Sequence, residues 1–352
     1  MILSGGRGTR LRPITHTSAK QLVPVANRPI LFYGIEAIRD AGITDVGIVV
    51  GDTREEIKAA VGDGSRFGIK VTYIHQADPL GLAHAVKVSE PFLGKDSFVM
   101  FLGDNLIKDG ITPLVDEFRR DSPNCQILLA EVRNPQEFGV AELSGDRVVR
   151  LEEKPKNPRS NLALVGVYMF DSTIFEAVNA IRPSRRNELE ITDAIQYLID
   201  HKFDVRSHVI TGWWKDTGKL EDMLEANRII LSGMTRKIEG TVSPDTRIEG
   251  PVEIGVGSNV SGSVLRGPIV IGKNCTIRGA YIGPFTSIAD DVEVVDSEVE
   301  HSIILENSKI QGLRRRIESS LIGRDVTVHR NPERVPAAYR LMVGDHSQIE
   351  VM

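Results

Sequence analysis

The first two-thirds of the chain alternates between two spacings of apolar residues. Across residues 30–38, apolar side chains recur at the three- and four-residue spacing of an amphipathic helix, which ends at Ala41 and Gly42. Residues 46–50 form a short, continuous apolar run, which is typical of a strand buried on both faces. Further helices are expected at 55–61 and 82–92, and further strands at 70–74 and 98–102. This alternation predicts an α/β domain with a mainly parallel sheet.

A different period begins at about residue 238. Branched apolar residues then recur at six-residue steps, beginning with Val242, Ile248, Ile254 and Val260. The step continues with small slips as far as Val328, and glycine often follows the apolar residue. Such hexapeptide repeats are the signature of a left-handed parallel β-helix, in which each short strand places one apolar side chain inward. We therefore expect two domains, over residues 1–237 and 238–352.

Three segments depart from these patterns. The run from Leu313 to Arg316 interrupts the six-residue step, so we expect a protruding loop whose arginines are solvated rather than bound to an anion. Residues 341–346, in the tail after Asn331, are expected to form a closing strand. Residues 1–3 are short for a buried strand, which suggests a natural start slightly upstream.

Composition narrows the class of protein. The 352 residues carry a formal net charge of −5, which argues against nucleic-acid binding as the main function. Cys125 and Cys275 both lie in apolar contexts, so no disulfide framework is expected. No run approaches the roughly 18 apolar residues of a membrane span. We therefore expect no membrane contact, no signal peptide and a cytoplasmic location.

The amino-terminal segment carries the most specific chemistry. Gly5, Gly6 and Gly8 follow the first apolar residues, and a loop without Cβ atoms lets backbone N–H groups approach an anion. Arg10 and Lys20 then add the full positive charges that a triphosphate requires. The segment matches neither the P-loop nor the dinucleotide-binding fingerprint. We therefore expect a nucleotide site of another kind.

Residues 4–13 together with residues 18–25 resemble the signature of the sugar-1-phosphate nucleotidyltransferases. Within that group the chain is most similar to the glucose-1-phosphate thymidylyltransferases of the longer form, which carry a carboxyl-terminal extension. The resemblance implies a Rossmann-like catalytic domain over 1–237 with Arg10 and Lys20 as catalytic residues. It implies nucleotide contacts at Leu3, Gly5, Gly6, Gly8, Thr9, Gln21, Gln76, Gly81 and Asp104.

Residues 75–85 resemble the base-recognition stretch of the family. The Gln76 side chain has the donor and the acceptor needed to pair with a pyrimidine edge. Gly81 would let the backbone approach the base. Residues 78–81 are equally a turn that begins a helix, and the two interpretations are compatible.

Two carboxylates are the candidate metal ligands. Asp104 follows the most apolar predicted strand, but by spacing alone a simple turn is about as good an explanation. Residues 212–218 resemble the second metal motif of the family, which adds Asp216. Two carboxylates with phosphate oxygens and water suit Mg²⁺. No His or Cys cluster has zinc spacing.

The sugar phosphate is expected at two further motifs. Residues 137–140 and 151–155 resemble the sugar-phosphate motifs of the family, although 152–155 taken alone is a charged hairpin end. The resemblance implies that Glu153 accepts sugar hydroxyls and that Lys154 pairs with the phosphate. It places Gly139, Val165 and Tyr168 in the same pocket. Phe138 stands where relatives often have tyrosine, and residues 188–193 are expected mainly as a helix start with one acid near the sugar.

The resemblance implies transfer of a thymidylyl group from dTTP to α-D-glucose 1-phosphate, giving dTDP-glucose and pyrophosphate for deoxysugar biosynthesis. Because one methyl and one hydroxyl separate the two substrates, UTP is expected to overlap with dTTP. One alternative is a bifunctional N-acetylglucosamine-1-phosphate uridylyltransferase and acetyltransferase, since His301 and His329 lie in or near the repeat. Another is a non-catalytic regulatory homologue, against which the set of charged site residues argues. We expect the β-helix to serve assembly of a homo-oligomer.

Overall fold

The computed structural model describes residues 1–6, 8–145, 147–331 and 341–350. Contacts divide the chain into two compact units. The first comprises Met1–Arg7, Ser18–Leu22 and Ile30–Asp216, and the second comprises Gly8–Thr17, Val23–Pro29 and Thr217–Met352. Two short amino-terminal segments therefore belong to the unit that contains the hexapeptide repeat. The boundary between residues 237 and 238, which was drawn from the repeat alone, stays a prediction.

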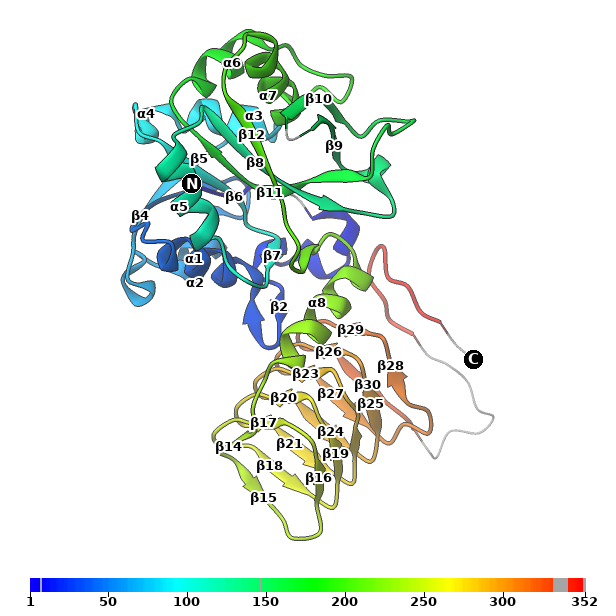
Figure 1. Ribbon diagram of the computed structural model, residues 1–352. Coiled ribbons are helices and arrows are strands. Elements are labelled where there is room, and N and C mark those ends of the chain that lie inside the picture. Colours follow the sequence, from blue (N-terminus) through cyan, green and yellow to red (C-terminus); the bar gives the residue numbers. More distant parts are fainter. Residues whose placement is uncertain (7, 146, 332–340, 351–352) are drawn as a thin grey trace. The chain divides into compact units, whose positions relative to one another are not determined.

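The first unit is built on a nine-stranded mixed sheet (Figure 1). Its strands, in spatial order, are β5 (Lys70–His75), β4 (Asp45–Val50), β1 (Ile2–Ser4), β6 (Phe98–Leu102), β11 (Leu162–Phe170), β8 (Cys125–Glu131), β12 (Val205–Val209), β10 (Arg147–Glu153) and β9 (Gly139–Ser144). The first four are parallel to one another, and β11 is antiparallel to both of its neighbours β6 and β8. A separate two-stranded sheet pairs β7 (Asn105–Ile107) with β13 (Trp214–Asp216).

Helices and apolar clusters cover both faces of the main sheet. The α-helices are α1 (Ile30–Asp40), α2 (Arg54–Val61), α3 (Leu82–Val88), α4 (Glu90–Leu93), α5 (Thr112–Asp121), α6 (Ile174–Ala180) and α7 (Ile191–Asp200), and the 3₁₀ turns of this unit are η3 (Lys20–Leu22), η4 (Ser65–Phe67) and η5 (Pro135–Glu137). One apolar cluster contains side chains of α3, α6 and α7, and the other contains side chains of α1, α2 and α5. Leu3 belongs to the first cluster and Ile2 to the second, as alternation along a strand requires. Burial on both faces explains the continuous apolar runs in the sequence.

Most of the elements that the spacing predicts are present. Helices α1 and α2 and strands β4, β5 and β6 occupy the predicted ranges. The single helix predicted over 82–92 is wrong, because the structure has two helices, α3 and α4, that meet at Ser89. Pro91 lies in the first turn of α4 and has no backbone N–H, so it cannot donate the hydrogen bond that would continue α3. In the part of the chain that the structure describes, no helix is long and apolar enough to cross a membrane.

The second unit contains three parallel sheets, which form the sides of a β-helix (Figure 1). The first sheet consists of β14 (Lys237–Ile238), β17 (Val252–Ile254), β20 (Ile269–Ile271), β23 (Thr286–Ile288), β26 (Ile303–Ile304) and β29 (Leu321–Ile322). The second consists of β15 (Thr241–Val242), β18 (Asn259–Ser261), β21 (Thr276–Arg278), β24 (Glu293–Val295), β27 (Lys309–Gln311) and β30 (Thr327–His329). The third consists of β16 (Arg247–Glu249), β19 (Val264–Arg266), β22 (Tyr281–Ile282), β25 (Glu298–Glu300) and β28 (Ile317–Glu318).

Residues of the six-residue step form the core of the β-helix. Val260, Ile277, Val294 and Ile310 are register partners on successive strands, and all four are fully buried. They belong to one apolar cluster. The three parallel sheets are consistent with the predicted left-handed β-helix. The predicted fold class, an α/β domain followed by a β-helix, is therefore confirmed. The prediction that the main sheet is mainly parallel is wrong, because β11, β10 and β9 pair with their neighbours in antiparallel fashion.

The carboxyl-terminal tail does not form the predicted closing strand. Residues 341–350 contain no strand, so the prediction over 341–346 is wrong. Leu341 and Val343 are exposed, and Met342 is 99% exposed. A strand here would bury too little apolar surface to offset the conformational entropy that it costs. At the predicted loop, the Arg316 guanidinium donates hydrogen bonds to Glu298 and Glu300.

One side chain joins three distant segments of the second unit. This unit also contains helix α8 (Leu220–Ser232), the hairpin of β2 (Pro24–Val25) and β3 (Arg28–Pro29), and the turns η1 (Thr9–Leu11) and η2 (Ile14–His16). Asn227 on α8 is fully buried. Its Oδ1 accepts hydrogen bonds from Ala26 N at 2.8 Å and from Ser287 Oγ at 2.6 Å, and its Nδ2 donates to Phe285 O at 2.9 Å. The hairpin, the helix and the β-helix therefore share one buried amide.

Candidate active site

Three predicted site segments follow neighbouring strands of the main sheet. Strands β5, β4, β1 and β6 are adjacent and parallel, so their carboxyl ends share one edge of the sheet. β1 leads into Gly5, β5 leads into Gln76, and β6 leads into Gly103 and Asp104. The topology therefore gathers the glycine loop, the base-recognition segment and the first metal candidate at that edge. Leu3 lies within β1, and its side chain belongs to the core.

Short backbone distances explain why glycine occupies this edge. A Cβ atom on Gly103 would lie 2.9 Å from Leu3 O, closer than real contacts of that kind. A Cβ atom on Gly5 would lie 3.5 Å from Gln76 Oε1, and one on Gly6 would lie 3.8 Å from Gln21 Nε2. The Gly5–Gly6 loop is therefore flanked by two side-chain amides, each of which can bond to a ligand.

Gln21 carries an unsatisfied acceptor beside this loop. Its side chain is buried, and its Oε1 has no hydrogen-bond partner among the described residues. Buried polar atoms are nearly always hydrogen-bonded, so an acceptor of this kind marks a place for a donor from a ligand or a water molecule. This observation supports the predicted nucleotide contact of Gln21.

Lys20 and two carboxylates converge at the same edge. Antiparallel pairing of β13 with β7 sets Asp216 opposite Asn105, the neighbour of Asp104. The Lys20 ammonium, on turn η3, forms an ion pair with Asp104 and lies 3.7 Å from Asp216 Oδ1. The carboxylates of Asp104 and Asp216 thus meet around the buried ammonium of Lys20, although Asp216 lies 196 positions after Lys20 in the sequence (216 minus 20).

The charges in this cluster stabilise one another. Burial alone would raise the pKa of the Asp104 carboxyl. The charge and the hydrogen bond of Lys20, together with a hydrogen bond from Asn105 Nδ2 at 3.0 Å, outweigh burial and hold that pKa below its ordinary value. Asp104 is therefore ionised at neutral pH, as a cation ligand must be.

The predicted base-recognition segment is held by backbone contacts. Gly81 has φ +104°, and a Cβ atom there would lie 2.4 Å from Leu189 O, so only glycine fits. The same carbonyl accepts a hydrogen bond from Ala83 N at 3.1 Å. Gln76 Nε2 lies 3.3 Å from Gly81 O and 3.0 Å from His84 Nδ1. This close packing accounts for Gly81, while contact of Gly81 with a base stays a prediction.

The predicted sugar motifs meet through strand pairing. Antiparallel β9 and β10 set Gly139 opposite Glu153. A Cβ atom on Gly139 would lie 2.7 Å from Thr192 Cγ2 and 3.2 Å from Glu153 Oε2, so any side chain here would have to displace these neighbours. Lys154 follows with φ +43°, and its Nζ lies 3.8 Å from Glu153 Oε1. The structure therefore brings three of the five predicted sugar-site residues together.

Sequence reasoning missed the charged group around Glu153. Arg186 Nη1 donates to Glu153 Oε1 at 3.0 Å and lies 3.6 Å from Glu190 Oε1. Arg186 Nη2 donates to Glu188 at 2.9 Å, and Glu190, only 4% exposed, accepts from Ser184 Oγ. Burial, followed by the charge of Glu190, raises the pKa of Glu153. The signal in the sequence is Arg186, two residues before Glu188. The segment 188–193 was expected to be mainly a helix start with one acid near the sugar, and no role was expected for Arg186.

Val165 and Tyr168 are core residues of β11. Their side chains are buried in opposite apolar clusters of the main sheet. The Tyr168 ring stacks on Phe170 with centroids 6.1 Å apart, and burial raises the pKa of its hydroxyl. Their assignment to the sugar pocket stays a prediction.

Gly8, Thr9 and Arg10 belong to the second unit. Gly8 has φ +61° and precedes turn η1, which contains the other two residues. A Cβ atom on Gly218 would lie 2.6 Å from Arg10 Nη2, so the guanidinium packs closely on the backbone there. Their predicted contacts with the nucleotide stay predictions.

Comparison with known proteins identifies the class of enzyme. A family model described as nucleotidyl transferase matches residues 1–233. The chain belongs to the nucleotidyl transferase family. It is 57% identical over 352 residues to the glucose-1-phosphate thymidylyltransferase of Streptomyces griseus, with 100% of this chain and 99% of that protein covered.

Two further comparisons extend this result. The chain is 34% identical over 327 residues to the bifunctional protein GlmU of Methanocaldococcus jannaschii, covering 92% of this chain and 77% of that protein. The chain also matches a crystal structure of a Bacillus anthracis protein that is assigned as a glucose-1-phosphate thymidylyltransferase and is in complex with sucrose. The TM-score is 0.61 and the sequence identity is 36%, and the match covers 65% of this chain and 93% of that one. The full-length similarity confirms the resemblance to thymidylyltransferases of the long form, and the protein is a nucleotidyltransferase.

The residues of this nucleotidyl transferase fit a divalent metal ion, which the family generally uses. Asp104 and Asp216 already converge on one cation, the Lys20 ammonium. Within the described ranges, no three His, Cys, Asp or Glu side chains are grouped so as to hold a metal ion by themselves. Mg²⁺ typically takes one or two carboxylates and completes its shell with water and phosphate oxygens. The donor set is therefore of the kind that Mg²⁺ prefers.

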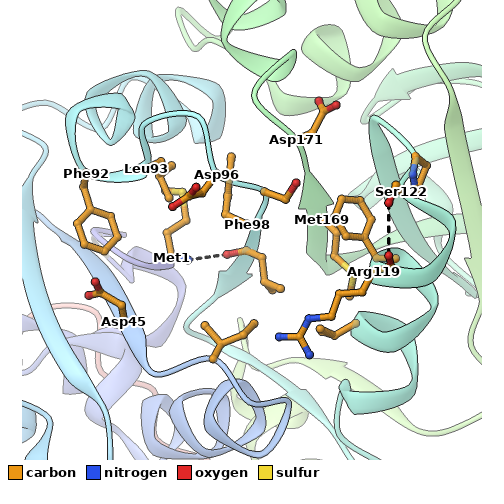
Figure 2. Close-up of a pocket in the computed structure, with 16 residues that line it drawn as sticks. Met1, Asp45, Phe92, Leu93, Asp96, Phe98, Arg119, Ser122, Met169 and Asp171 are labelled. Atoms are coloured by element: carbon orange, nitrogen blue, oxygen red, sulfur yellow. Dashed lines mark hydrogen bonds between the residues drawn. The ribbon is translucent and has the colours of Figure 1, made fainter.

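A separate cavity of about 470 Å³ lies at the opposite edge of the nucleotidyl transferase sheet (Figure 2). Residues near the starts of the parallel strands line it, including Met1, Asp45 and Phe98. Figure 2 shows the Met1 amine directed at a neighbouring strand, where it donates a hydrogen bond to Val99 O at 2.5 Å. None of the predicted site residues lines this cavity, so it is not the candidate active site.

Proposed function

We propose that this enzyme transfers a thymidylyl group from dTTP to α-D-glucose 1-phosphate and releases pyrophosphate. The observation that carries the proposal is the convergence of Lys20, Asp104 and Asp216 at the edge of the sheet that holds the glycine loop. Similarity over the full chain to a thymidylyltransferase supports the choice of substrates. The product, dTDP-glucose, would supply deoxysugar biosynthesis in the cytoplasm, and we expect the enzyme to act as a homo-oligomer.

The reaction needs alignment and charge neutralisation rather than a base. A phosphate oxygen of the sugar phosphate attacks the α-phosphorus as the bond from phosphorus to the bridging oxygen of pyrophosphate breaks. The attacking phosphate is already ionised near pH 7, so no proton has to be removed. Lys20 stabilises charge on the α-phosphate, and Arg10 stabilises charge on the leaving pyrophosphate. Lys154 attracts the sugar phosphate, which the triphosphate would otherwise repel.

Asp104 and Asp216 would hold Mg²⁺ in this site. When bound, the ion neutralises phosphate oxygens of the nucleotide and so lowers the barrier to attack by a second anion. The two carboxylates also hold the Lys20 ammonium in place, because it is paired with both. Orientation of Lys20 therefore depends on the same residues as metal binding.

The sugar phosphate would bind at the Glu153 group. Glu153 and Glu190 offer carboxylate oxygens to sugar hydroxyls, and Lys154 and Arg186 offer positive charge. Arg186 fixes Glu153 through the bond at 3.0 Å, so the acceptor is oriented before the sugar arrives. Phe138, whose ring packs against Trp214 with centroids 5.6 Å apart, supplies no hydroxyl to this region.

Release of pyrophosphate tests the proposal. The assay pairs dTTP, UTP, dCTP, dATP and dGTP in turn with glucose 1-phosphate and N-acetylglucosamine 1-phosphate, in the presence of Mg²⁺. The highest kcat/KM for dTTP with glucose 1-phosphate is the expected result. UTP should rank next, because a missing methyl costs only about 1–3 kcal/mol.

The same assay addresses the two alternatives. Preference for UTP with the N-acetylated sugar, together with thiol release from acetyl-CoA and glucosamine 1-phosphate, would indicate the bifunctional enzyme. No turnover with any pair would indicate a regulatory homologue.

A further inference from the structure

The Gln76 side chain is held in one of its two possible orientations. Gln76 is 8% exposed and directly follows β5. One end of its amide lies 3.3 Å from Gly81 O, and a backbone carbonyl can only accept a hydrogen bond. The NH₂ end must therefore face Gly81. This requirement leaves Oε1 directed away from Gly81, on the side of Gly5, where a Cβ atom would lie 3.5 Å from it.

The orientation of Gln76 fixes the hydrogen-bonding state of His84. The same Nε2 that faces Gly81 lies 3.0 Å from His84 Nδ1. Because Nε2 is a donor, Nδ1 must be an acceptor, so the imidazole is neutral and carries its proton on Nε2 of the ring. Burial, followed by the charge of Lys87, lowers the pKa of His84, although Asp78 opposes this. A neutral His84 is therefore the state expected at neutral pH.

Both hydrogens of the Gln76 amide are thus used within the protein. One is directed to Gly81 O and the other to His84 Nδ1. No donor among the described residues bonds to Oε1. The side chain therefore presents one acceptor, beside the glycine loop, and no donor. Nucleobases differ in what they place opposite such an acceptor: thymine and uracil carry N3–H and guanine carries N1–H, whereas cytosine and adenine carry a bare nitrogen.

We propose that His84 is a positioning residue that determines base specificity, because it locks the Gln76 amide with its oxygen toward the nucleobase. The inference rests on the proposed function, in which residues 75–85 face the base. It deepens that function by explaining why cytosine and adenine would be rejected. The lone pair on the bare ring nitrogen of either base would face the lone pair on Gln76 Oε1, so the two atoms would repel each other and Oε1 would have no donor. Without the acceptor on His84, only the longer bond to Gly81 O, at 3.3 Å, opposes rotation of the amide, so its NH₂ group can more readily be offered to either class of base.

Three variants test the role of His84. His84→Leu removes the acceptor and fills the position with an apolar side chain. His84→Asn restores an acceptor, because its Oδ1 is attached to Cγ as Nδ1 is in histidine. Glu90→Gln, at an exposed position at the start of the next helix, is the matched control. For each protein, kcat and KM are measured with dTTP and dCTP at saturating glucose 1-phosphate, and nucleotide Kd values are measured without the sugar phosphate.

The expected result is a change in discrimination rather than in chemistry. His84→Leu should reduce the ratio of kcat/KM for dTTP over dCTP about tenfold, since one buried hydrogen bond is worth about 1.4 kcal/mol or less. The change should appear in KM and Kd, with kcat for dTTP within about threefold of wild type. His84→Asn should return most of the discrimination, and Glu90→Gln should leave it unchanged.

Other outcomes overturn the inference in distinguishable ways. If the wild-type enzyme uses dTTP and His84→Leu keeps the wild-type ratio while kcat/KM falls equally for both nucleotides, His84 has only a structural role and the proposed function stands. If His84→Asn behaves as His84→Leu does, the acceptor is not the relevant feature and the inference again fails alone. If the wild-type enzyme does not turn over dTTP with glucose 1-phosphate, the proposed function and the inference fail together.

Discussion

The main sheet of the first unit and the sheets of the β-helix both contain parallel strands, but they differ in where charged side chains lie. Inside the β-helix the register partners Val260, Ile277 and Val294 are all apolar, and ion pairs such as Arg316–Glu298 lie on its outside. In the first unit, by contrast, Lys20 and Glu190 are both buried, and each has several other charges around it. Buried charges seldom add stability. Among the described residues, buried charged side chains occur in the first unit and none occur in the β-helix, so the groups able to act on a charged substrate are concentrated in the first unit.

The largest effect should come from removing the buried cation. We expect Lys20→Ala to lower kcat about 10²–10³-fold with little change in KM for dTTP, because the charge acts on the transition state. Steady-state kinetics measure both constants, and exposed Lys95→Ala serves as the control. A variant that raised KM and kept kcat would show that Lys20 only binds the nucleotide.

A cavity in the β-helix should produce the reverse pattern. We expect Ile277→Ala to lower the free energy of unfolding of the second unit by about 3 kcal/mol, as loss of a fully buried aliphatic side chain does, and to leave kcat and KM unchanged below the transition. Denaturant unfolding measures the change. Val256→Ala, at a side chain that is 57% exposed, should alter the free energy by less than about 0.5 kcal/mol. If Ile277→Ala lowered kcat under conditions in which the protein is fully folded, the β-helix core would contribute to catalysis, and the proposed difference between the two regions would be wrong.

A smaller effect should separate the sugar site from the nucleotide site. We expect Glu153→Gln to raise KM for glucose 1-phosphate about tenfold and to leave KM for dTTP within about twofold, because one charged acceptor is lost at the sugar end only. Glu152→Gln, at the neighbouring exposed residue, is the matched control. Equal changes in both KM values would place Glu153 outside the sugar site.

The smallest effect concerns the pH dependence of stability. The pKa of Glu153 is raised in the folded protein from an ordinary value of 4.5, chiefly by burial. The folded state therefore binds its proton more tightly than the unfolded state, and stability from this group is lost as pH rises above 4.5 through the folded pKa. Glu153→Gln should show a weaker loss of stability over that range, as thermal unfolding at a series of pH values would reveal. A curve parallel to that of the wild-type protein would mean that Glu153 titrates normally.

Local patterns carried the prediction of the fold. The six-residue step predicted the β-helix core because each strand of the repeat places an apolar side chain at the same inward position. This pattern can be recognised from residues that are close together in the sequence. Helix α1 and strand β6 were predicted for the same reason. The break at Ser89 was missed because the apolar spacing continues across Pro91, and the tail strand was wrong because apolar spacing cannot show whether a sheet edge is available.

The candidate site could be predicted only in part, because it depends on contacts between residues that are far apart in the sequence. Asp216 reaches Lys20 only because β13 pairs with β7, which no local pattern of the sequence reveals. The resemblance to a family supplied both residues, whereas Arg186 was missed because its partner Glu153 lies on β10, 33 positions away in the sequence. The orientation of the Gln76 amide likewise depends on the backbone carbonyl of Gly81, which no residue type encodes.

The shared amide of Asn227 has a consequence for building chimaeric enzymes. The hairpin that contains Ala26, helix α8 and the β-helix all bond to it, although two of these segments precede the hexapeptide repeat in the chain. A recombination point chosen at residue 237 would therefore transplant the coils without the hairpin and the helix that fit them. Grafting a β-helix from a relative should succeed more often when residues 8–17 and 23–29 are taken from the same donor as the carboxyl-terminal part.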